Sequence, residues 1–577
     1  MAERPDYAKP MVGWYDPPQL LRTGALVLVS QQFALHGDNR EIQALAAPHS
    51  DAADYSKLDE VWIDFVADCG DGWNSTYAVA SEVGKEKLEL TLDEKDVVLH
   101  RGSILIFGGD LVYPTPAGQG YDDRLLKPYS AAFAKPQHRP DVWALPGNHD
   151  WYDSLSGFRR LFCTDEDFGP WQSRQRTSYF AIKLPHQWWL FGVDVQLLHD
   201  IDHRQLEYFE AVLKQVGEQD RVILVCAEPY WVEYITQPVG SSRYIKSLLQ
   251  TLREKIGDDR LRLAVAGDLH YYQRLSAKDP QRHLVTCGTG GAFLHPTHAA
   301  SPQSFPSGYG EEACFPIARK SRRLTRGNIF FLFRNPLFGI VPGFVYLLVA
   351  WTTGINIGET FGRVQIGELG LVGIREFWQA IHIGVQSAIL SPIGVAIYAM
   401  IFAGFIVFTQ SKSKMFRWWA GSLHSLAHVL VGFFIFWGVS YICMTVLGLV
   451  PKSITQYLIA GALIFPAAWI GGSIVMGLYL WIALNVFGEH ANESFSALRV
   501  QDWKGFLRMK ICSDGSLDIY FVGIERVPRR WKKEATAPEA GGPEHWIPHD
   551  SAAKPAKIVD YATIERSPAI VKAAGSV

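Results

Sequence analysis

The sequence predicts an α/β domain, built as a layered β-sandwich with flanking helices, that precedes an all-α region of four transmembrane helices and a small C-terminal segment with a β-hairpin. Three observations predict this class. Short apolar runs bounded by turn residues recur before residue 300, with amphipathic stretches between some of them. Four long stretches after residue 334 contain no Asp, Glu, Lys or Arg. Charged residues make up only 20% of the chain, against about 25% in soluble proteins.

Composition excludes several other classes. The 577 residues are 48% hydrophobic, too apolar for a disordered chain, and glycine has no collagen-like period. The net charge of -3 indicates no general basic surface, so we expect no nucleic-acid partner. The seven cysteines are odd in number and never form a C-x-x-C pair. They predict a reducing compartment rather than a disulfide framework or a thiolate zinc site.

The expected domain order follows these changes in composition. An apolar run from Thr23 to Ala34 lacks the cleavage pattern of a signal peptide and is interpreted as part of a domain. We expect an N-terminal extension (1–57), the α/β domain (58–300), a basic linker (301–334), the transmembrane region (335–488), a C-terminal segment on the cytoplasmic side (489–533) and a disordered tail (534–577). Within the C-terminal segment, Asp514-Gly515 between two apolar runs predicts a hairpin turn.

The four charge-free stretches are each longer than the roughly 20 residues that span a bilayer. They predict helices at about 336–357, 383–409, 419–450 and 457–487. Lys and Arg gather before the first helix, between the second and third, and after the fourth, which places both termini in the cytoplasm. The expected localisation is a multi-pass membrane protein, in the inner or plasma membrane if the source is bacterial, with the lipid bilayer as a partner.

Potential metal ligands follow the buried runs of the α/β domain. In open α/β sheets, sites form at the carboxyl ends of strands. Five separate strand ends could therefore converge on one crevice. The polar residues found there are Asp68, Asp110, Asn148 with His149 and Asp150, Glu228, and Asp268 with His270.

These residues resemble the calcineurin-like metallophosphoesterase superfamily. The strongest match is Gly147-Asn148-His149-Asp150, which corresponds to the family's G-N-H-D/E motif, preceded by its G-D motif at Gly109-Asp110. Asp110 with Tyr113 is similar to the G-D-x-x-Y of purple acid phosphatases, and Asp68-Cys69-Gly70 is similar to their D-x-G. The resemblance covers about residues 58–298 in the family's order. It implies a phosphoric ester hydrolase with two metal ions.

Two positions depart from the family pattern. Glu228 and Asp268 stand where the family normally has histidines. The resemblance implies a first metal held by Asp68, Asp110, Tyr113 and His270. It implies a second held by Asp110, Asn148, Glu228 and Asp268, with Asp110 as the bridge. Because the second set is all oxygen and the first includes imidazole and phenolate, divalent or mixed-valence manganese and iron are the expected metals.

The catalytic roles implied by the resemblance fall to His149 and Asp150. His149 would stabilise the transition state or protonate the leaving group, and Asp150 would orient it. The alternative for Asp150 is a turn cap. Asp71 could replace Asp68 as a ligand or serve in a turn. Glycines 288, 290 and 291 could admit phosphate or make a tight connection, and His295 and His298 could line the substrate mouth or be ordinary loop residues.

The expected function is hydrolysis of a phosphate ester or diphosphate on a small molecule or a lipid, by attack of a metal-activated hydroxide. Because four helices would anchor the domain, a lipid-linked substrate is attractive. Two alternatives remain: a sensor or scaffold that binds a phosphorylated ligand without hydrolysis, and a transporter or channel regulated by the domain. The sequence gives no oligomeric state.

A second polar cluster is expected near the cytoplasmic ends of the last two spans. His424 and His428 are four residues apart on one helix face, and His490 and Glu493 follow the fourth span. These four residues are a possible ligand set for zinc or iron. The alternative is interhelical hydrogen bonding.

Overall fold

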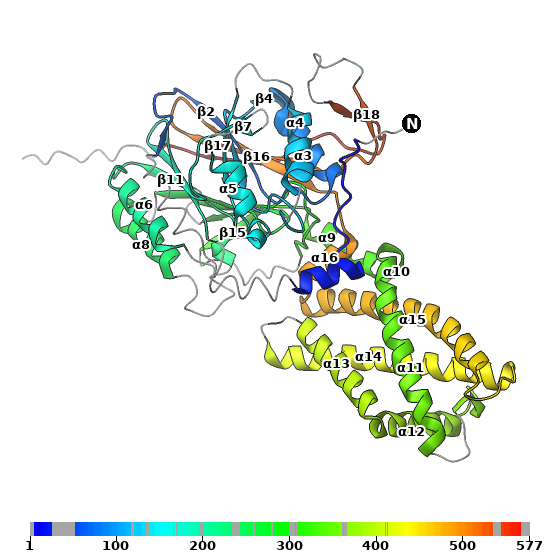
Figure 1. The fold of residues 1–577 in the computed structure, drawn as a ribbon. Helices are drawn as coiled ribbons and strands as arrows, with labels where there is room; N and C mark the ends of the chain where they lie inside the picture. The colour runs from blue at the N-terminus through cyan, green and yellow to red at the C-terminus, as the bar shows by residue number, and fades with distance from the viewer. Residues whose placement is uncertain are drawn as a thin grey trace, which may run out of the picture. The chain divides into compact units, whose positions relative to one another are not determined.

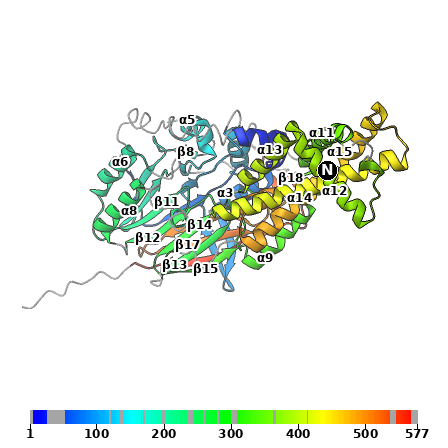
Figure 2. The ribbon, with the colours of Figure 1, turned by 90° about the horizontal axis from the view of Figure 1, so that it is seen from below.

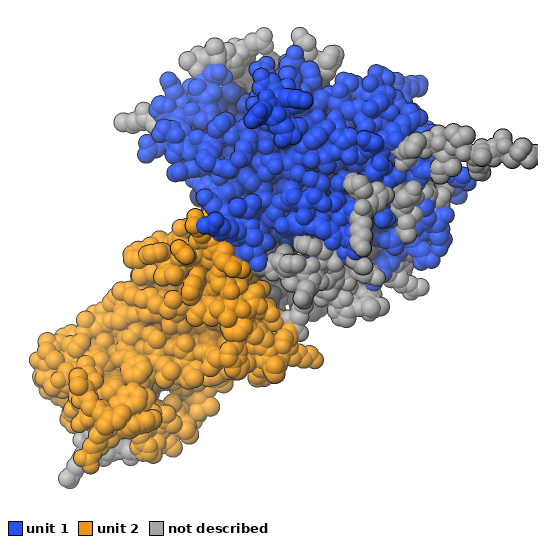
Figure 3. All heavy atoms as spheres, turned by 180° about the vertical axis from the view of Figure 1, so that it is seen from behind, with its two compact units in different colours: residues 1–12, 25–321, 499–577 blue, residues 13–24, 322–498 orange. Residues whose placement is uncertain are grey.

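The computed structural model divides into two compact units, which Figure 3 colours separately. Unit 1 comprises residues 1–12, 25–321 and 499–577, and unit 2 comprises residues 13–24 and 322–498. The structure describes residues 5–25, 52–116, 120–133, 139–164, 167–168, 171–195, 201–232, 243–257, 260–277, 281–298, 306, 308–360, 366–409, 411, 413–534 and 544–566. Most of the apolar run from Thr23 to Ala34 lies outside these residues.

Unit 1 contains two large mixed sheets (Figures 1 and 2). The first has the strand order β1 (Ala53–Asp54), β9 (Phe180–Leu184), β10 (Trp188–Val193), β11 (Arg221–Cys226), β12 (Leu261–Ala266), β14 (His283–Cys287), β13 (Tyr272–Ala277) and β15 (Tyr309–Phe315). The second has the order β20 (Lys557–Ile564), β17 (Leu517–Ile524), β16 (Lys504–Ile511), β2 (Val61–Val66), β5 (Ile104–Gly108), β6 (Asp141–Leu145), β8 (Trp171–Ser173) and β7 (Asp167–Phe168). Two small hairpins complete the described strands: β3 (Lys87–Leu92) with β4 (Lys95–His100), and β18 (Trp531–Lys533) with β19 (Trp546–Pro548).

The two sheets pack face to face, as the predicted sandwich requires. Alternate residues of β2, such as Ile63 and Phe65, share a buried cluster with Ile223 and Val225 of β11. Helices bury the opposite face of each sheet. The second sheet is covered by α3 (Trp73–Gly84), α4 (Lys127–Ala132) and α5 (Ser156–Phe162), and the first by α6 (His203–Leu213) and α8 (Arg243–Ile256). The layered α/β sandwich with flanking helices is confirmed.

The C-terminal segment is part of this sandwich. β16 pairs with β17 through the predicted Asp514-Gly515 turn, and β16 also pairs antiparallel with β2. Arg508 of β16 makes a buried bidentate ion pair with Asp64 of β2, at 2.7 and 2.9 Å. The hairpin prediction is confirmed, but the expectation of a separate C-terminal segment is wrong. These strands complete the second sheet.

The prediction of a disordered tail over residues 534–577 is also wrong where the structure describes it. Lys557–Ile564 forms β20, which pairs with β17, and Trp546–Pro548 forms β19. Asp560 of β20 accepts hydrogen bonds from Tyr272 and Arg274, both of β13 in the other sheet. Residues 535–543 and 567–577 lie outside the described residues.

The predicted basic linker over residues 301–334 also contains regular structure. Tyr309–Phe315 forms β15, which pairs with β13 at the edge of the first sheet. The chain then continues as α9 (Ala318–Leu324), a 3-10 turn (Thr325–Phe330) and α10 (Phe331–Arg334). The sandwich therefore extends beyond the predicted boundary at residue 300.

Unit 2 is helical. Three of its helices are long and apolar enough to cross a membrane: Pro336–Gly354 within α11 and the turn before it, Lys414–Val446 and Ile454–Phe487. The corresponding elements are α11 (Ile340–Thr360), α14 (Lys414–Tyr441) and α15 (Ile454–Ile482), and α16 (Ala491–Leu498) follows them. These three helices agree with the first, third and fourth predicted spans.

The second predicted span is not a single straight helix. The chain forms α12 (Ile374–Leu390) and α13 (Pro392–Phe408), bent by 98° at the break between them. The Ser391 side chain caps α13 and Pro392 occupies its first turn, so the local sequence starts a new helix at this point. Neither helix is long and apolar enough to span a membrane by itself. The pair passes this test only when the two helices are taken together as one broken span.

Candidate metal centre

Three aspartates at the strand ends share an unusual backbone conformation. Asp68 follows β2, Asp110 follows β5 and Asp268 follows β12, and all three have positive φ, at 58°, 51° and 66°. Few side chains other than Asn and Asp adopt this region without strain. The strands β2, β5 and β6 are mutually parallel, as are β11 and β12, so their carboxyl ends reach a common edge within each sheet.

The Tyr113 hydroxyl is the meeting point of the predicted first-metal ligands. It lies 3.0 Å from Asp68 Oδ1, 3.1 Å from Asp110 Oδ2 and 3.0 Å from His270 Nε2. The other ring nitrogen of His270, Nδ1, donates to the Phe293 carbonyl, which leaves Nε2 as an acceptor in the neutral ring. Three acceptors thus surround a hydroxyl that has one proton. A cation would satisfy all of them.

Two of the predicted ligands of the second metal, Asp110 and Asn148, lie on loops that are joined by a hydrogen bond. Asp110 Oδ1 accepts from the His149 backbone amide at 2.8 Å, which joins the loop after β5 to the loop after β6. Asn148 Oδ1 is buried and has no hydrogen-bond partner. Burying a carbonyl oxygen without a hydrogen-bond partner costs free energy, so such an atom normally has a partner or a bound ion. Asn148 therefore fits the role of a metal ligand.

The two replacements of the family histidines are also at strand ends. The Asp268 backbone amide donates to Asp68 Oδ2 at 2.9 Å, so this loop lies against the first-metal ligands. Glu228 follows β11 directly and is buried. Among the residues that the structure describes, no three His, Cys, Asp or Glu side chains are already placed to hold an ion by themselves. Asp68, Asp110 and His270 meet through the Tyr113 hydroxyl.

Burial governs the protonation of this cluster. It raises the pKa of Asp68 to about 7. Burial, followed by the charges of Asp68, Asp150 and Asp268, raises the pKa of Asp110 well above its usual value. The positive charge near Asp68, from Lys504, is too small to offset the effect of burial. Divalent cations would supply further positive charge, and their binding would displace protons.

Asp150 binds the loop rather than the ring of His149. Its carboxylate accepts hydrogen bonds from the Gly147 and Leu111 amides and from the Tyr121 hydroxyl, the last at 2.7 Å. The His149 ring is oriented instead by the Pro114 carbonyl, which accepts from Nδ1 at 2.8 Å. These hydrogen bonds favour the turn-cap alternative for Asp150 over the predicted orienting role.

The alternatives for Asp71 and the glycines are resolved by their contacts. The Asp71 carboxylate accepts from the Val12 and Phe293 amides, so it ties two segments together. A Cβ at Gly288 would lie 2.5 Å from Asp68 Oδ2, and the Gly290 amide donates to the Ala67 carbonyl. The glycine segment therefore makes a tight connection against the Asp68 loop.

The two loop histidines have separate surroundings. The His295 ring stacks on His270 with ring centroids 3.9 Å apart, and its Nδ1 accepts from the His270 amide. His298 Nδ1 lies 2.8 Å from the Ser321 hydroxyl. His295 therefore supports a predicted metal ligand, whereas His298 joins the loop to α9.

Lys504 is a candidate site residue that the sequence did not reveal. It begins β16, is fully buried, and its Nζ has no hydrogen-bond partner. Burial lowers its pKa to about 7, against the opposing influence of Asp502, Asp71 and Asp68. No local sequence signal marks it, because its position depends on the pairing of β16 with β2.

The predicted histidine cluster in unit 2 is a hydrogen-bonded network. His428 Nε2 lies 3.2 Å from His424 Nε2, and His428 Nδ1 lies 2.7 Å from the Tyr346 hydroxyl. His490 Nε2 lies 2.9 Å from the Tyr479 hydroxyl. His490 Nδ1 lies 3.5 Å from Glu493. The interhelical alternative therefore agrees with the described residues, where no metal-holding group of this kind is found.

The fold, together with the similarity of residues 61–272 to a known family, supports a metal-dependent phosphoesterase in general. Residues 61–272 match the family model of the calcineurin-like phosphoesterases, and this part of the chain is a domain of that family. No curated protein matches the chain. The match covers β2 to the start of β13, and thus every predicted metal ligand, but not the C-terminal strands.

Proposed function

We propose that this protein is a membrane-anchored phosphoesterase with two metal ions that hydrolyses a phosphate ester or diphosphate. The observation that carries the proposal is the convergence of Asp68, Asp110 and His270 on the Tyr113 hydroxyl. The unpartnered Asn148 Oδ1 beside this cluster supports it. The proposal also rests on the family match of residues 61–272.

The residues present fit two metal ions with an unusually oxygen-rich set of ligands. Asp68, Tyr113 and His270 would hold the first, Asn148, Glu228 and Asp268 the second, and Asp110 both. Bound metals would supply an activated hydroxide and clamp the phosphate oxygens. Manganese and iron suit these ligands better than zinc, because hard carboxylate and amide oxygens predominate.

His149 is the proposed proton donor or transition-state stabiliser. Its Nδ1 donates to the Pro114 carbonyl, so Nε2 is the ring atom that can exchange a proton with a substrate. Burial lowers the pKa of His149 to about 4 in the protein alone. A negatively charged phosphate beside the ring would raise that pKa and favour proton transfer.

Lys504 is a proposed source of positive charge for the substrate. Its buried Nζ has no hydrogen-bond partner, although a buried ammonium is stable only when it is paired or loses its proton. A phosphate oxygen would provide the missing partner. Because Lys504 lies on β16, the C-terminal strands would contribute to substrate binding as well as to the fold.

The pairing of the C-terminal strands with β2 supports an even number of membrane crossings. β2 precedes residues 322–498 of unit 2 and β16 follows them, yet the two strands are neighbours in one sheet. Both ends of the helical unit must therefore return to the same side of a membrane. Three long helices give an odd number, so the bent pair α12–α13 would complete a fourth crossing.

The proposed side is the cytoplasm, because Lys and Arg are concentrated on the segments next to the sandwich. Single-cysteine labelling in intact cells tests this orientation, with the native cysteines replaced. Lys414→Cys should react only after permeabilisation, whereas Lys452→Cys should react from outside. Labelling of Lys414→Cys from outside would overturn the orientation.

A phosphorylated lipid or lipid-linked diphosphate is the proposed substrate class, and a soluble phosphoester is the alternative within the same chemistry. The bilayer anchor favours the lipid, because it concentrates the enzyme at the surface where such substrates lie. Full-length protein in detergent, supplied with manganese, should release phosphate from at least one member of a panel of lipid and soluble phosphoesters. Binding without release by any metal-loaded sample would favour the sensor alternative.

A further inference from the structure

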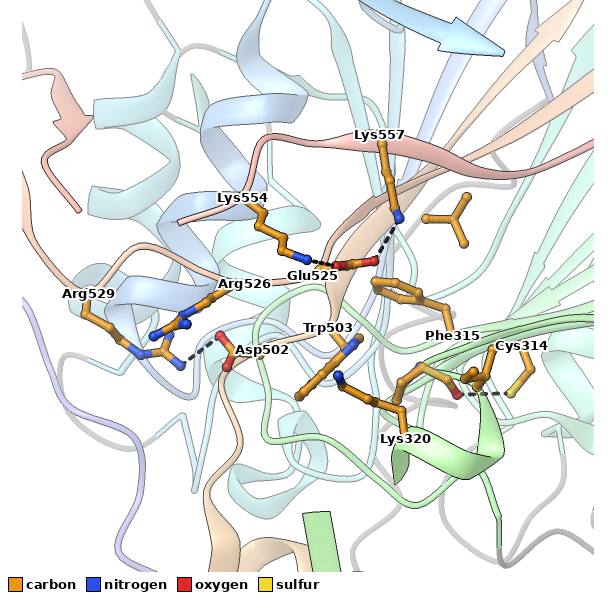
Figure 4. A pocket seen from close by; sticks show the side chains of 13 residues that line it. Cys314, Phe315, Lys320, Asp502, Trp503, Glu525, Arg526, Arg529, Lys554 and Lys557 are labelled. Atoms are coloured by element: carbon orange, nitrogen blue, oxygen red, sulfur yellow. Dashed lines mark hydrogen bonds and ion pairs between the residues drawn. The ribbon is translucent and has the colours of Figure 1, made fainter. Parts of the chain in front are cut away.

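Unit 1 has a cavity whose lining residues are distinct from those of the strand-end cluster. It encloses about 600 Å³. Its walls come from the start of α9, the entry to β16, the segment after β17, and β20 (Figure 4). The charged lining residues are Lys320, Arg526, Arg529, Lys554, Lys557, Asp502 and Glu525. Five cations thus face two carboxylates.

The two carboxylates hold three of the cations in place. Glu525 pairs with both Lys554 and Lys557, as Figure 4 shows, and the second of these contacts is 2.7 Å. Asp502 pairs with Arg529 at 2.9 Å. The lysines lower the pKa of Glu525 to about 2, so it stays ionised at neutral pH. This prearrangement reduces the entropy that a ligand would lose in ordering these side chains.

The other two cations, Lys320 and Arg526, are exposed and have no side-chain ion pair among the described residues. They carry charge that the cavity does not neutralise. An anion with several oxygens would bind between the paired and the unpaired cations, because phosphate groups accept charge-assisted hydrogen bonds from Lys and Arg.

The remaining wall is apolar. It includes Phe315, Ile317, Trp503 and Val559, and 63% of the Ile317 side chain is exposed. Ile317 lies on the segment that leads into the first candidate span, and Trp503 on the segment that returns from the last. The cavity thus places cations beside an apolar wall, and it lies on both connections to the apolar helices. This combination suits a lipid, which has a charged headgroup and apolar chains.

We propose that this cavity binds a phosphate-bearing anionic ligand, supplied by a lipid headgroup or by a free polyphosphate. The ligand would occupy the space between Lys320, Arg526 and the lysines held by Glu525. This site does not depend on the proposed hydrolysis, since it shares no residue with the predicted metal ligands.

Native mass spectrometry of the full-length protein in detergent, with metal removed, tests the proposal. One arm titrates short-chain phosphatidylglycerol, and the other titrates inorganic tripolyphosphate. The test variant combines Lys320→Glu with Arg526→Glu, because neither side chain has an ion pair to break. The matched control is Lys532→Glu, an exposed lysine of the same C-terminal segment outside the cavity.

The wild type and the control should bind at least one probe with equal affinity, and the double variant should bind it about tenfold or more weakly. Binding of phosphatidylglycerol alone would identify a lipid source, and binding of tripolyphosphate alone a soluble one. Equal binding by all three proteins, or binding by none, would overturn the proposal. Circular dichroism of the double variant confirms that a loss of binding does not come from unfolding, and metal-dependent hydrolysis, measured separately, reports on the proposed function.

Discussion

The strand-end cluster of unit 1 and the histidine cluster of unit 2 both contain buried histidine and tyrosine side chains, but they differ in their supply of hydrogen-bond donors. At the strand ends, two carboxylates and one imidazole nitrogen surround the single Tyr113 hydroxyl, and Asn148 Oδ1 has no partner. Among the described helices, the Tyr346 and Tyr479 hydroxyls lie against His428 and His490, and the nitrogens without a hydrogen-bond partner are His424 Nδ1 and His490 Nδ1. The first cluster has more acceptors than protons, whereas each neutral histidine ring of the second supplies one donor and one acceptor.

An excess of acceptors points to a bound cation, whereas a supply of both donors and acceptors suits a structural network. An excess of buried acceptors is unfavourable unless a cation or added protons neutralise it. A balanced network is stable as it stands, and each interhelical bond contributes about 1 kcal/mol.

The largest expected effect comes from Asp110, the proposed bridge between both metals. Asp110→Asn should lower phosphoester hydrolysis by more than about four orders of magnitude, beyond the range of a proton-transfer residue, because activated hydroxide would be lost with the metals. Initial rates with manganese measure it. Glu210→Gln, an exposed carboxylate on α6, is the control and should keep full activity. Hydrolysis by Asp110→Asn at the wild-type rate would contradict the role.

The second-largest loss of activity is expected on substitution of His149, which is not a proposed metal ligand. His149→Ala should lower turnover by about two to four orders of magnitude and leave the bound metal unchanged, because only proton transfer is removed. Turnover and metal content are measured on the same sample. The control is His203→Ala, a histidine on α6 whose side chain is 62% exposed. Full turnover by His149→Ala would show that its ring has no catalytic role.

A third test compares two ion pairs of β16, one buried and one exposed. Arg508→Leu leaves Asp64 buried without its partner and should destabilise unit 1 by about 3–5 kcal/mol. Lys510→Leu breaks a pair with the half-exposed Glu60 and should cost at most about 1 kcal/mol. Thermal unfolding in detergent, followed by tryptophan fluorescence, ranks the two. Equal midpoints would show that the buried Arg508–Asp64 pair contributes no more than the exposed pair.

The smallest expected effect is on thermal stability: the amount by which bound metal stabilises the protein should depend on pH. Burial raises the pKa of Asp68 to about 7, against about 4 for an unfolded chain. The metal-free fold therefore loses stability as pH rises from about 4 through 7, where this carboxyl ionises without compensation. Manganese should raise the unfolding midpoint more at pH 7.5 than at pH 5, relative to a chelated sample. A larger shift at pH 5 would contradict the acceptor-excess argument.

The strand ends of the α/β domain and the C-terminal hairpin turn could be predicted, because short local patterns determine them. The strands before Asp68, Asp110 and Asn148 are apolar runs that end at a polar residue, and the Asp514-Gly515 turn is a short-range signal. The partners of the C-terminal strands were not predictable, because β16 pairs with a strand more than 400 residues earlier. That pairing also hid Lys504.

Two errors had usable signals. Lys557–Ile564 contains β-branched and aromatic residues typical of strands, but the surrounding Ala, Pro and Gly obscured it. Ser391-Pro392 is a helix start inside an otherwise continuous apolar stretch, and it marks the break between α12 and α13. The role of Asp150 had no such signal, since a turn cap and an orienting carboxylate require the same residue at the same position.

The most direct test of the central claim is the metal content of the purified full-length protein, measured by mass spectrometry after loading with manganese and removal of free ions. We expect two ions per chain in the wild type, as is general for this family. We expect their loss in Asp110→Asn and their retention in the double variant His424→Ala with His428→Ala. Retention of both ions by Asp110→Asn, or loss of an ion from the histidine variant, would contradict the assignment of metal to the strand-end cluster alone.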